Sequence, residues 1–224
     1  MSTGSVSFEV RPYGERAVLL DLPDSAGRRA ITHWLIEHAP QGVEWVPAER
    51  TVLLQVGDRG ASLAAAHDLL TAALHDLRGA DVSDRGRTET GSPVVTLDVV
   101  YDGPDLAEAA QALDMSIEAL VSWHTGQPWE VEFLGFMPGF GYLTRQGDLL
   151  DVPRRPSPRT RIPVGSVGLA GRYSGVYPTA SPGGWQLIGT TSAVLFDPGG
   201  DGALLTPGGR VQFQVSEGTE RGRG

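Results

Sequence analysis

An uncharged stretch, GFMPGFGYL at residues 135–143, is the first candidate for a functional surface. Its glycines permit backbone conformations that other residues avoid and let another group approach closely, while its proline fixes one φ angle. With phenylalanine, methionine and tyrosine side chains, this backbone can form a stiff apolar wall for a small ligand or a partner protein. It can also be a buried turn that only packs, because most apolar clusters belong to a core. The segment alone leaves both interpretations open.

Arginines gather directly after this stretch. Between Thr144 and Gly175 there are six arginines and two acids, which gives a local balance of +4 in a chain with a formal net charge of -9. Four of the six lie in PRRPSPRTRIP at residues 153–163, where prolines reduce the entropy lost when a side chain is ordered on an anion. A guanidinium binds carboxylates and phosphates through paired hydrogen bonds. The stretch is a candidate anion site, and a solvated loop whose arginines pair with acids elsewhere stays the alternative.

Two further candidates lie on either side of the arginines. SPGGW at residues 181–185 again combines a turn-forming backbone with an aromatic side chain, although Trp185 could simply fill the end of a barrel. His124 ends an expected helix, whose C-terminal dipole favours a protonated imidazole, although a lone histidine is more often structural than catalytic. The other four histidines lie on expected helices without the carboxylate spacing of a metal site, so we expect no metal.

The composition excludes several kinds of chemistry. The chain has no cysteine, and all 18 of its basic residues are arginine. It therefore lacks thiolate metal ligands, a cysteine nucleophile, a Walker lysine and a Schiff-base lysine. The sequence also has no GxSxG elbow, no GxGxxG after a strand and no HExxH. We expect that another chain supplies ATP binding or a tethered carrier if the activity needs one.

Charge and hydropathy indicate the class of partner. A net charge of -9 disfavours binding to nucleic acid and to anionic membranes, because both need a cationic face. No apolar run approaches the ~20 residues that cross a bilayer, and MSTGSVSFEV does not resemble a signal peptide. We expect a cytoplasmic protein whose partners are proteins or small molecules.

The first half of the sequence predicts a small sheet with helices on one face. Residues 6–22 indicate two strands around a turn at Pro12 to Gly14, and residues 43–57 have strand character. Helices are predicted at 30–39 and at 61–78, where Ser62 is a plausible cap. The polar segment 79–93 is typical of a linker. We therefore predict two domains, residues 1–88 and 89–224.

The second half predicts a closed or nearly closed barrel. A strand is expected at 94–101, and helices at 103–113 and 116–124. Asp105 and Glu108 have the spacing of a capping box, with the Asp as the cap. From Trp129 onward, short apolar segments alternate with Pro and Gly turns, as in small barrels. The expected fold class is α+β.

The ordered motifs of the second half resemble one known family. EFLGFMPGFGYL, VPRRPSPRTRIPVGSVGLAG, GVYPTASPGGWQLIGTT and LFDP follow one another as in the KipI / allophanate hydrolase subunit 1 family, whose bacterial members are mostly described as the B subunit of 5-oxoprolinase. The resemblance covers about residues 8–214. Thr190, Tyr173 and Ser174 depart from the Arg, Gln and Thr that are usual in the family.

This resemblance implies a fold and a function. The fold would be a small N-terminal α/β sandwich domain followed by a C-terminal cyclophilin-like β-barrel domain. The function would be that of the B subunit in an ATP-dependent 5-oxoprolinase, a hetero-oligomer that also has an A subunit, together with a C subunit that is similar to allophanate hydrolase subunit 2. The complex would hydrolyse the lactam of 5-oxo-L-proline to L-glutamate, with ATP used by the complex and not bound by this chain alone. The alternatives are an allophanate or urea-amide hydrolase or carboxyltransferase subunit, and a KipI-type inhibitor that binds a sensor histidine kinase.

The resemblance also implies a site for a small amide or lactam. His124, near the rim of a cleft, and Arg159 would be catalytic, and either Arg154 or Arg159 would bind the substrate carboxylate. The walls of the cleft and a cation for the substrate carboxylate would come from the following residues: Phe136, Pro138, Gly139, Phe140, Tyr142, Arg154, Ser181, Gly183, Gly184 and Trp185.

Overall fold

The computed structural model describes residues 6–57, 62–78, 94–147 and 150–217. Contacts within the chain group it into two compact units, Met1–Arg87 and Thr88–Gly224. The predicted linker at 79–93 lies outside the described residues, so the boundary between domains 1–88 and 89–224 stays a prediction. In the described part of the chain, no helix combines the length and apolar character that crossing a membrane requires.

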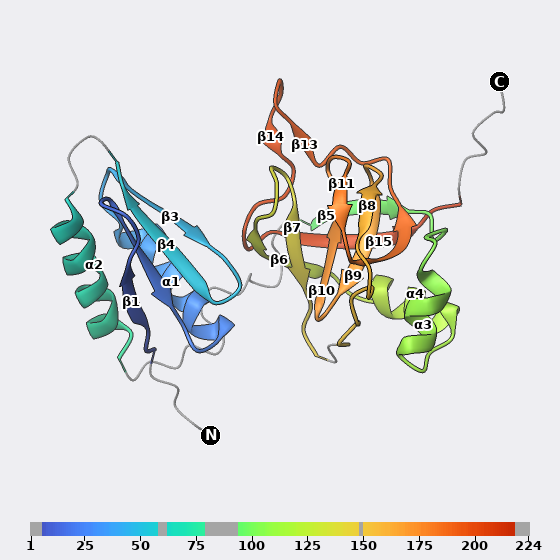
Figure 1. The fold of residues 1–224 in the computed structure, drawn as a ribbon, viewed down its shortest axis with the longest axis horizontal. Helices are drawn as coiled ribbons and strands as arrows, with labels where there is room; N and C mark the ends of the chain where they lie inside the picture. Colours follow the sequence, from blue (N-terminus) through green and yellow to red (C-terminus); the bar gives the residue numbers. More distant parts are fainter. Residues whose placement is uncertain (1–5, 58–61, 79–93, 148–149, 218–224) are drawn as a thin grey trace. The chain divides into compact units, whose positions relative to one another are not determined.

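The first unit is an antiparallel sheet covered by two helices (Figure 1). The strand order is β1-β2-β4-β3, and both helices contact each other and β4. Alternate residues of β4, among them Val52 and Leu54, are fully buried, so one face of the sheet forms the core with the helices. The elements are β1 (Glu9–Pro12), β2 (Ala17–Asp21), α1 (Ser25–His38), β3 (Val43–Pro47), β4 (Thr51–Val56) and α2 (Leu63–Asp76).

Side-chain caps fix where the helices of the first unit begin. Ser62 accepts a hydrogen bond from the Ala65 N–H at 3.2 Å, which confirms the predicted cap of α2. Asp24 accepts from the Gly27 N–H at 2.8 Å, so α1 begins at Ser25, earlier than the apolar spacing predicted. The strand character expected at 43–57 is divided between β3 and β4, which pair with each other.

The second unit is built on one strongly curved sheet of seven strands (Figure 1). The strand order is β12-β9-β10-β7-β6-β15-β5. Its elements are β5 (Val94–Val99), α3 (Leu106–Ala112), α4 (Ile117–Thr125), β6 (Trp129–Leu134), β7 (Gly141–Thr144), β8 (Arg159–Ile162), β9 (Ser166–Ala170), β10 (Tyr173–Val176), β11 (Ser181–Gly183), β12 (Gln186–Thr190), β13 (Phe196–Asp197), β14 (Gly202–Ala203) and β15 (Arg210–Val215).

Two hydrogen bonds join the opposite edges of this sheet. Val100, which directly follows β5, donates to the Thr190 carbonyl of β12 at 2.9 Å and accepts from the Thr190 N–H at 2.8 Å. The sheet is therefore a nearly closed barrel, and this part of the predicted fold is confirmed. The helices are few, as expected for a mixed α/β chain rich in glycine and proline.

Small residues allow the barrel wall to be buried on both sides. All residues of β9 and β10 are buried. A Cβ at Gly175 would lie 2.8 Å from Phe140 Cζ and 3.1 Å from Trp185 Cζ3. Only glycine therefore leaves room for the aromatic side chains that pack across β10.

The capping box predicted at the start of α3 is wrong. Asp105 is the residue before the helix, but its side chain makes no capping hydrogen bond. Its carboxylate is directed instead to arginines more than forty positions away, as described below. Helix α4 does have its predicted cap, because Ser116 accepts from the Ala119 N–H at 3.1 Å.

Candidate functional site

An aromatic cluster brings the segments 135–143 and 181–185 together. The ring of Trp185 lies 5.4 Å from that of Phe140 and 5.7 Å from that of Tyr142, measured between centroids. Phe133, Tyr173 and Tyr177 belong to the same cluster, which is separate from the interior core of the barrel. The two stretches that the sequence singled out are therefore one structural feature.

The turn that carries Phe136 is tight and holds an unusual backbone. Gly135 N–H donates to the Phe140 carbonyl at 3.2 Å, and Phe140 N–H donates to the Met137 carbonyl at 3.1 Å. Phe136 has a φ of 68°, in the left-handed region, which costs a residue with a Cβ roughly 1–2 kcal/mol. Gly139 has a φ of 81°, and a Cβ there would lie 2.6 Å from Phe196 Cβ. Strain of this kind in an exposed turn points to a functional constraint.

The residues of this cluster differ in exposure. Phe140 and Trp185 are buried, at 1% and 6% exposure, so their part of the motif does pack as a core. Phe136 is 57% exposed, although its ring contacts those of Phe140 and Tyr177 edge to face. Pro138 is exposed, Gly139 is buried, and Tyr142, Ser181, Gly183 and Gly184 are partly buried. The same motif therefore contributes a buried ring, Phe140, to the cluster and an exposed ring, Phe136, to the surface.

A buried carboxylate holds two arginines of the segment 153–163. Asp105 is 1% exposed, and its Oδ1 accepts from Arg155 Nη1 at 2.5 Å. Arg159 binds the same carboxylate through two nitrogens, at 2.7 and 2.8 Å, and the Leu187 N–H donates to Oδ2 at 2.8 Å. Burial opposes ionisation of Asp105, but the hydrogen bonds from Arg159 and Leu187 N–H bring its pKa below the ordinary value. The hydrogen bond to Asp105 correspondingly raises the pKa of Arg159.

Arg154 differs from Arg155 and Arg159 in that Asp105 does not bind its side chain. Its side chain is exposed, and within the described ranges it has no hydrogen-bond or ion-pair partner. Burial and the nearby Tyr142 raise the pKa of Tyr177 to about 12, while the charges of Arg154 and Arg159 act in the opposite direction. The N–H of the next residue, Arg155, donates to the Gly184 carbonyl at 2.9 Å, so the backbone of Arg154 lies near the edge of the aromatic cluster that contains Trp185.

The structure contradicts the expected position of His124 near the rim of a cleft. His124 is 0% exposed, and its ring stacks on Phe213 with centroids 4.3 Å apart. Its Nδ1 lies 2.7 Å from the Tyr101 hydroxyl and its Nε2 lies 2.8 Å from Ser174 Oγ. A neutral imidazole satisfies both contacts, because one nitrogen donates and the other accepts.

The expected protonation of His124 is also wrong. Burial, with a smaller contribution from the charge of Arg145, lowers the pKa of His124 to about 3. The helix dipole that favoured the cation contributes only about 0.3–1 kcal/mol at an exposed position, which desolvation outweighs. His124 holds α4 against β10 from inside the barrel, and its predicted catalytic role stays a prediction.

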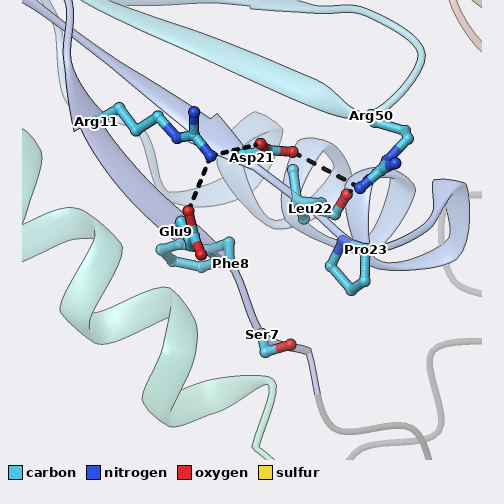
Figure 2. A pocket seen from close by; sticks show the side chains of 8 residues that line it. All are labelled: Ser7, Phe8, Glu9, Arg11, Asp21, Leu22, Pro23 and Arg50. Carbon is cyan, nitrogen blue, oxygen red and sulfur yellow. Dashed lines mark hydrogen bonds and ion pairs between the residues drawn. The ribbon is translucent and has the colours of Figure 1, made fainter.

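A hollow of about 340 Å³ lies in the first unit and contains none of these residues (Figure 2). It forms at the end of the β1–β2 pair, and Phe8, Leu22 and Pro23 make its apolar side. The guanidiniums on its rim are already paired. Arg11 lies 2.9 Å from Glu9 and 3.1 Å from Asp21, and Arg50 lies 3.9 Å from Asp21. None of the sequence motifs contributes to this hollow, and the described residues contain no cluster of His, Asp and Glu that could hold a metal ion.

Sequence reasoning missed two residues of the candidate site. The local spacing predicts a helix cap at Asp105, whereas its arginine partners are 50 and 54 positions away. Tyr177 lies in GVYPTASPGGW, but its hydroxyl could be placed beside Gly183 only by the structure, where a Cβ on that glycine would lie 2.8 Å from the oxygen. The excess of arginine over acid after Thr144 was the available signal for a buried acid from elsewhere in the chain.

Comparison with known proteins gives a family match over most of the chain. The family model "Carboxyltransferase domain, subdomain C and D" matches residues 8–206. The B subunit of 5-oxoprolinase from Escherichia coli O157:H7 is 48% identical over 129 residues, 56% of this chain and 59% of that protein. The protein of the same name from Bacillus subtilis (strain 168) is 43% identical over 134 residues, 58% of this chain and 56% of that protein. The chain therefore matches somewhat less than two thirds of the length of these relatives.

Solved structures share the fold. The crystal structure of TTHA0988 superposes with a TM-score of 0.71 at 35% identity, and the match covers 94% of this chain and 41% of that chain. The urea carboxylase of Kluyveromyces lactis superposes with a TM-score of 0.68, over 94% of this chain and 22% of that chain. At 19% identity the second likeness concerns the fold alone.

Proposed function

The chain belongs to the family of the carboxyltransferase domain, subdomains C and D, and from this premise we propose that it is the B subunit of an ATP-dependent 5-oxoprolinase. In this proposal, it works with the A and C subunits in one complex and helps to hydrolyse 5-oxo-L-proline to L-glutamate. The names of the curated relatives support the proposal. We further assign the second unit to the cyclophilin-like barrels and the first to a small α/β sandwich.

One observation carries the choice of substrate: the exposed Arg154 directly precedes Arg155, whose N–H donates to the Gly184 carbonyl next to Trp185 of the aromatic cluster. 5-Oxoproline is a five-membered lactam with one carboxylate, so it needs an apolar surface for the ring and a cation for the acid. Phe136 and Tyr142 offer the surface, and Arg154 offers a guanidinium without a partner among the described residues. A guanidinium and a carboxylate form charge-assisted, paired hydrogen bonds.

The groups around this surface suit the cleavage of an amide. Hydrolysis adds water across the C–N bond of the lactam, and the carbonyl oxygen becomes negative on the way. Neutral phenols are hydrogen-bond donors, and a tyrosine with an ordinary pKa is neutral near pH 7. We therefore assign Tyr142, which is partly buried, to orient the lactam carbonyl, and Tyr177, which is 1% exposed, to support the aromatic surface from behind.

Arg159 and His124 receive roles different from those first expected. Arg159 donates from Nη1 and from Nη2 to the buried Asp105, so we assign Arg159 to hold the loop and Arg154 to bind the substrate. Since His124 is buried, we propose that it acts through Ser174 and the barrel wall without touching the substrate.

ATP belongs to the complex in this proposal. Its hydrolysis supplies the driving force for opening a stable lactam, and another chain of the complex binds it, in agreement with a sequence that has no Walker lysine.

Reconstitution tests the proposed function. The purified chain is mixed with the corresponding A and C subunits, and L-glutamate is measured with and without ATP. We expect glutamate only from the complete mixture with ATP. Activity from this chain alone, or equal activity from the other two subunits without it, would contradict the proposal. Offering allophanate or urea to the same mixture separates the alternative substrates, and titration with a sensor histidine kinase checks the inhibitor alternative.

A further inference from the structure

The buried carboxylate of Asp105 joins three segments that are far apart in the sequence. It stands at the start of α3, it binds Arg155 and Arg159 of the segment 153–163, and it accepts from the Leu187 N–H of β12. Each of its two oxygens accepts two hydrogen bonds, at distances from 2.5 to 2.8 Å. This is a closed set of charge-assisted bonds in a site that water hardly reaches.

The backbone on both sides of Arg154 is held as well. Val152 exchanges two hydrogen bonds with Gly171, at 2.7 and 2.9 Å. The N–H of Arg155 donates to the Gly184 carbonyl at 2.9 Å, which ties the arginine segment to SPGGW. Pro153 and Arg154 lie between these two attachments; both are exposed, and Arg154 carries the charge. Its backbone is therefore fixed while its guanidinium remains available.

The charges of the segment explain why an acid is needed there. Arg154, Arg155 and Arg159 put three positive charges within six residues of the segment. With Asp105, two of the three are engaged at 23% and 25% side-chain exposure. Glu108 lies 3.8 Å from Arg155 but is 59% exposed, so solvent screens its effect.

We propose, on the basis of the proposed function, that Asp105 is a positioning residue: it withdraws Arg155 and Arg159 from the substrate and fixes the segment that presents Arg154 as the carboxylate-binding arginine. The substitution Asp105→Asn is suited to the test, because asparagine has the same shape and can still accept from the Leu187 N–H. Glu108→Gln is the matched control, since it removes a nearby acid that is exposed.

Chemical labelling of the isolated full chain tests the positioning directly. Phenylglyoxal reacts with accessible guanidiniums, and peptide mass spectrometry reports each arginine separately. In the wild type we expect Arg154 to react about tenfold faster than Arg159, the difference expected when one of two arginines is held by charged hydrogen bonds. In Asp105→Asn the three rates should become similar, while Glu108→Gln should retain the wild-type pattern. Similar rates in the wild type, or an unchanged pattern in Asp105→Asn, would overturn the proposal.

Kinetics of the reconstituted complex test the consequence for the substrate. Asp105→Asn should raise the KM for 5-oxoproline about tenfold with kcat changed much less, because the arginine that binds the carboxylate is no longer positioned. A role in stability alone would lower the melting temperature and leave KM as it is, and that result would overturn the proposal. An inactive wild-type complex would refute the proposed function, whereas the labelling pattern would still decide whether Asp105 positions the arginines.

Discussion

Replacing His124 with glutamine should remove a pH dependence from the stability of the second unit. The folded chain holds His124 as a neutral imidazole, because burial lowers its pKa from the ordinary 6.5 to about 3. The unfolded chain binds a proton on this residue below pH 6.5, and the folded chain does not. Acid therefore favours the unfolded state. The stability that neutral His124 provides is complete above pH 6.5 and is lost progressively as the pH falls toward 3.

The size of the effect follows from this linkage. Between pH 7 and pH 5 the free energy of unfolding should fall by about 2 kcal/mol through His124 alone, as long as its folded-state pKa lies well below 5. Glutamine can still bond to Tyr101 or Ser174, but it loses the stacking on Phe213. His124→Gln should be less stable than the wild type at pH 7 by about 1–3 kcal/mol. Its free energy of unfolding should show little of the fall of about 2 kcal/mol that the wild type shows between pH 7 and pH 5.

Urea unfolding of the full chain at several pH values measures this difference. Hydrogen exchange followed by mass spectrometry of peptides from residues 94–217 reports the second unit separately from the first. His67→Gln, which removes an exposed histidine of α2, is the control. In this variant the unfolding free energy of the second unit should fall between pH 7 and pH 5 as it does in the wild type. If the wild type and His124→Gln lose equal stability from pH 7 to pH 5, His124 titrates normally in the folded chain and the reasoning is refuted.

Three further substitutions test the backbone and the surface of the site. Phe136→Gly should change the free energy of unfolding by less than about 1 kcal/mol, because relief of the strained φ offsets the lost ring contacts. The same substitution should raise the KM of the reconstituted complex for 5-oxoproline. A large loss of stability with an unchanged KM would show that the ring only packs. Gly103→Ala should lower the unfolding free energy by about 3 kcal/mol or more, because its Cβ would lie 2.3 Å from the Leu187 carbonyl oxygen, and a near-neutral result in urea unfolding would contradict this. Gly184→Ala should fold with wild-type stability in the same assay, because its Cβ would meet Pro158 at an ordinary 3.8 Å.

The sequence predicted features that depend on local chemistry. Ser62 and Ser116 cap helices because a hydroxyl before an apolar helical pattern finds the free N–H groups of the first turn. Short apolar segments between glycines and prolines predicted a nearly closed barrel, because such segments bury their apolar sides by packing around one shared core. Each of these residues or segments lies within a few positions of the helix or strand that it predicts.

Features that depend on distant partners could not be predicted in the same way. Asp105 and Glu108 have the spacing of a capping box, but two arginines more than forty residues away offered the carboxylate stronger, charge-assisted bonds than the helix N–H groups did. The helix dipole predicts a protonated His124, whereas the environment of its ring is set by Phe213, Tyr101 and Ser174 from other segments. The arginines 154, 155 and 159 are alike in sequence, and only the position of Asp105 distinguishes them.

The most direct test of the proposed site is a comparison of two lactams. 2-Pyrrolidinone has the ring of 5-oxoproline without its carboxylate, so the ratio of kcat/KM for the two compounds measures recognition of the acid. In the reconstituted complex, Arg154→Ala should lower this ratio by about 10- to 100-fold, the worth of a charge-assisted hydrogen bond. The same change at the exposed Arg161 should leave the ratio as it is. An unchanged preference for 5-oxoproline in Arg154→Ala would contradict the claim that this surface binds the substrate.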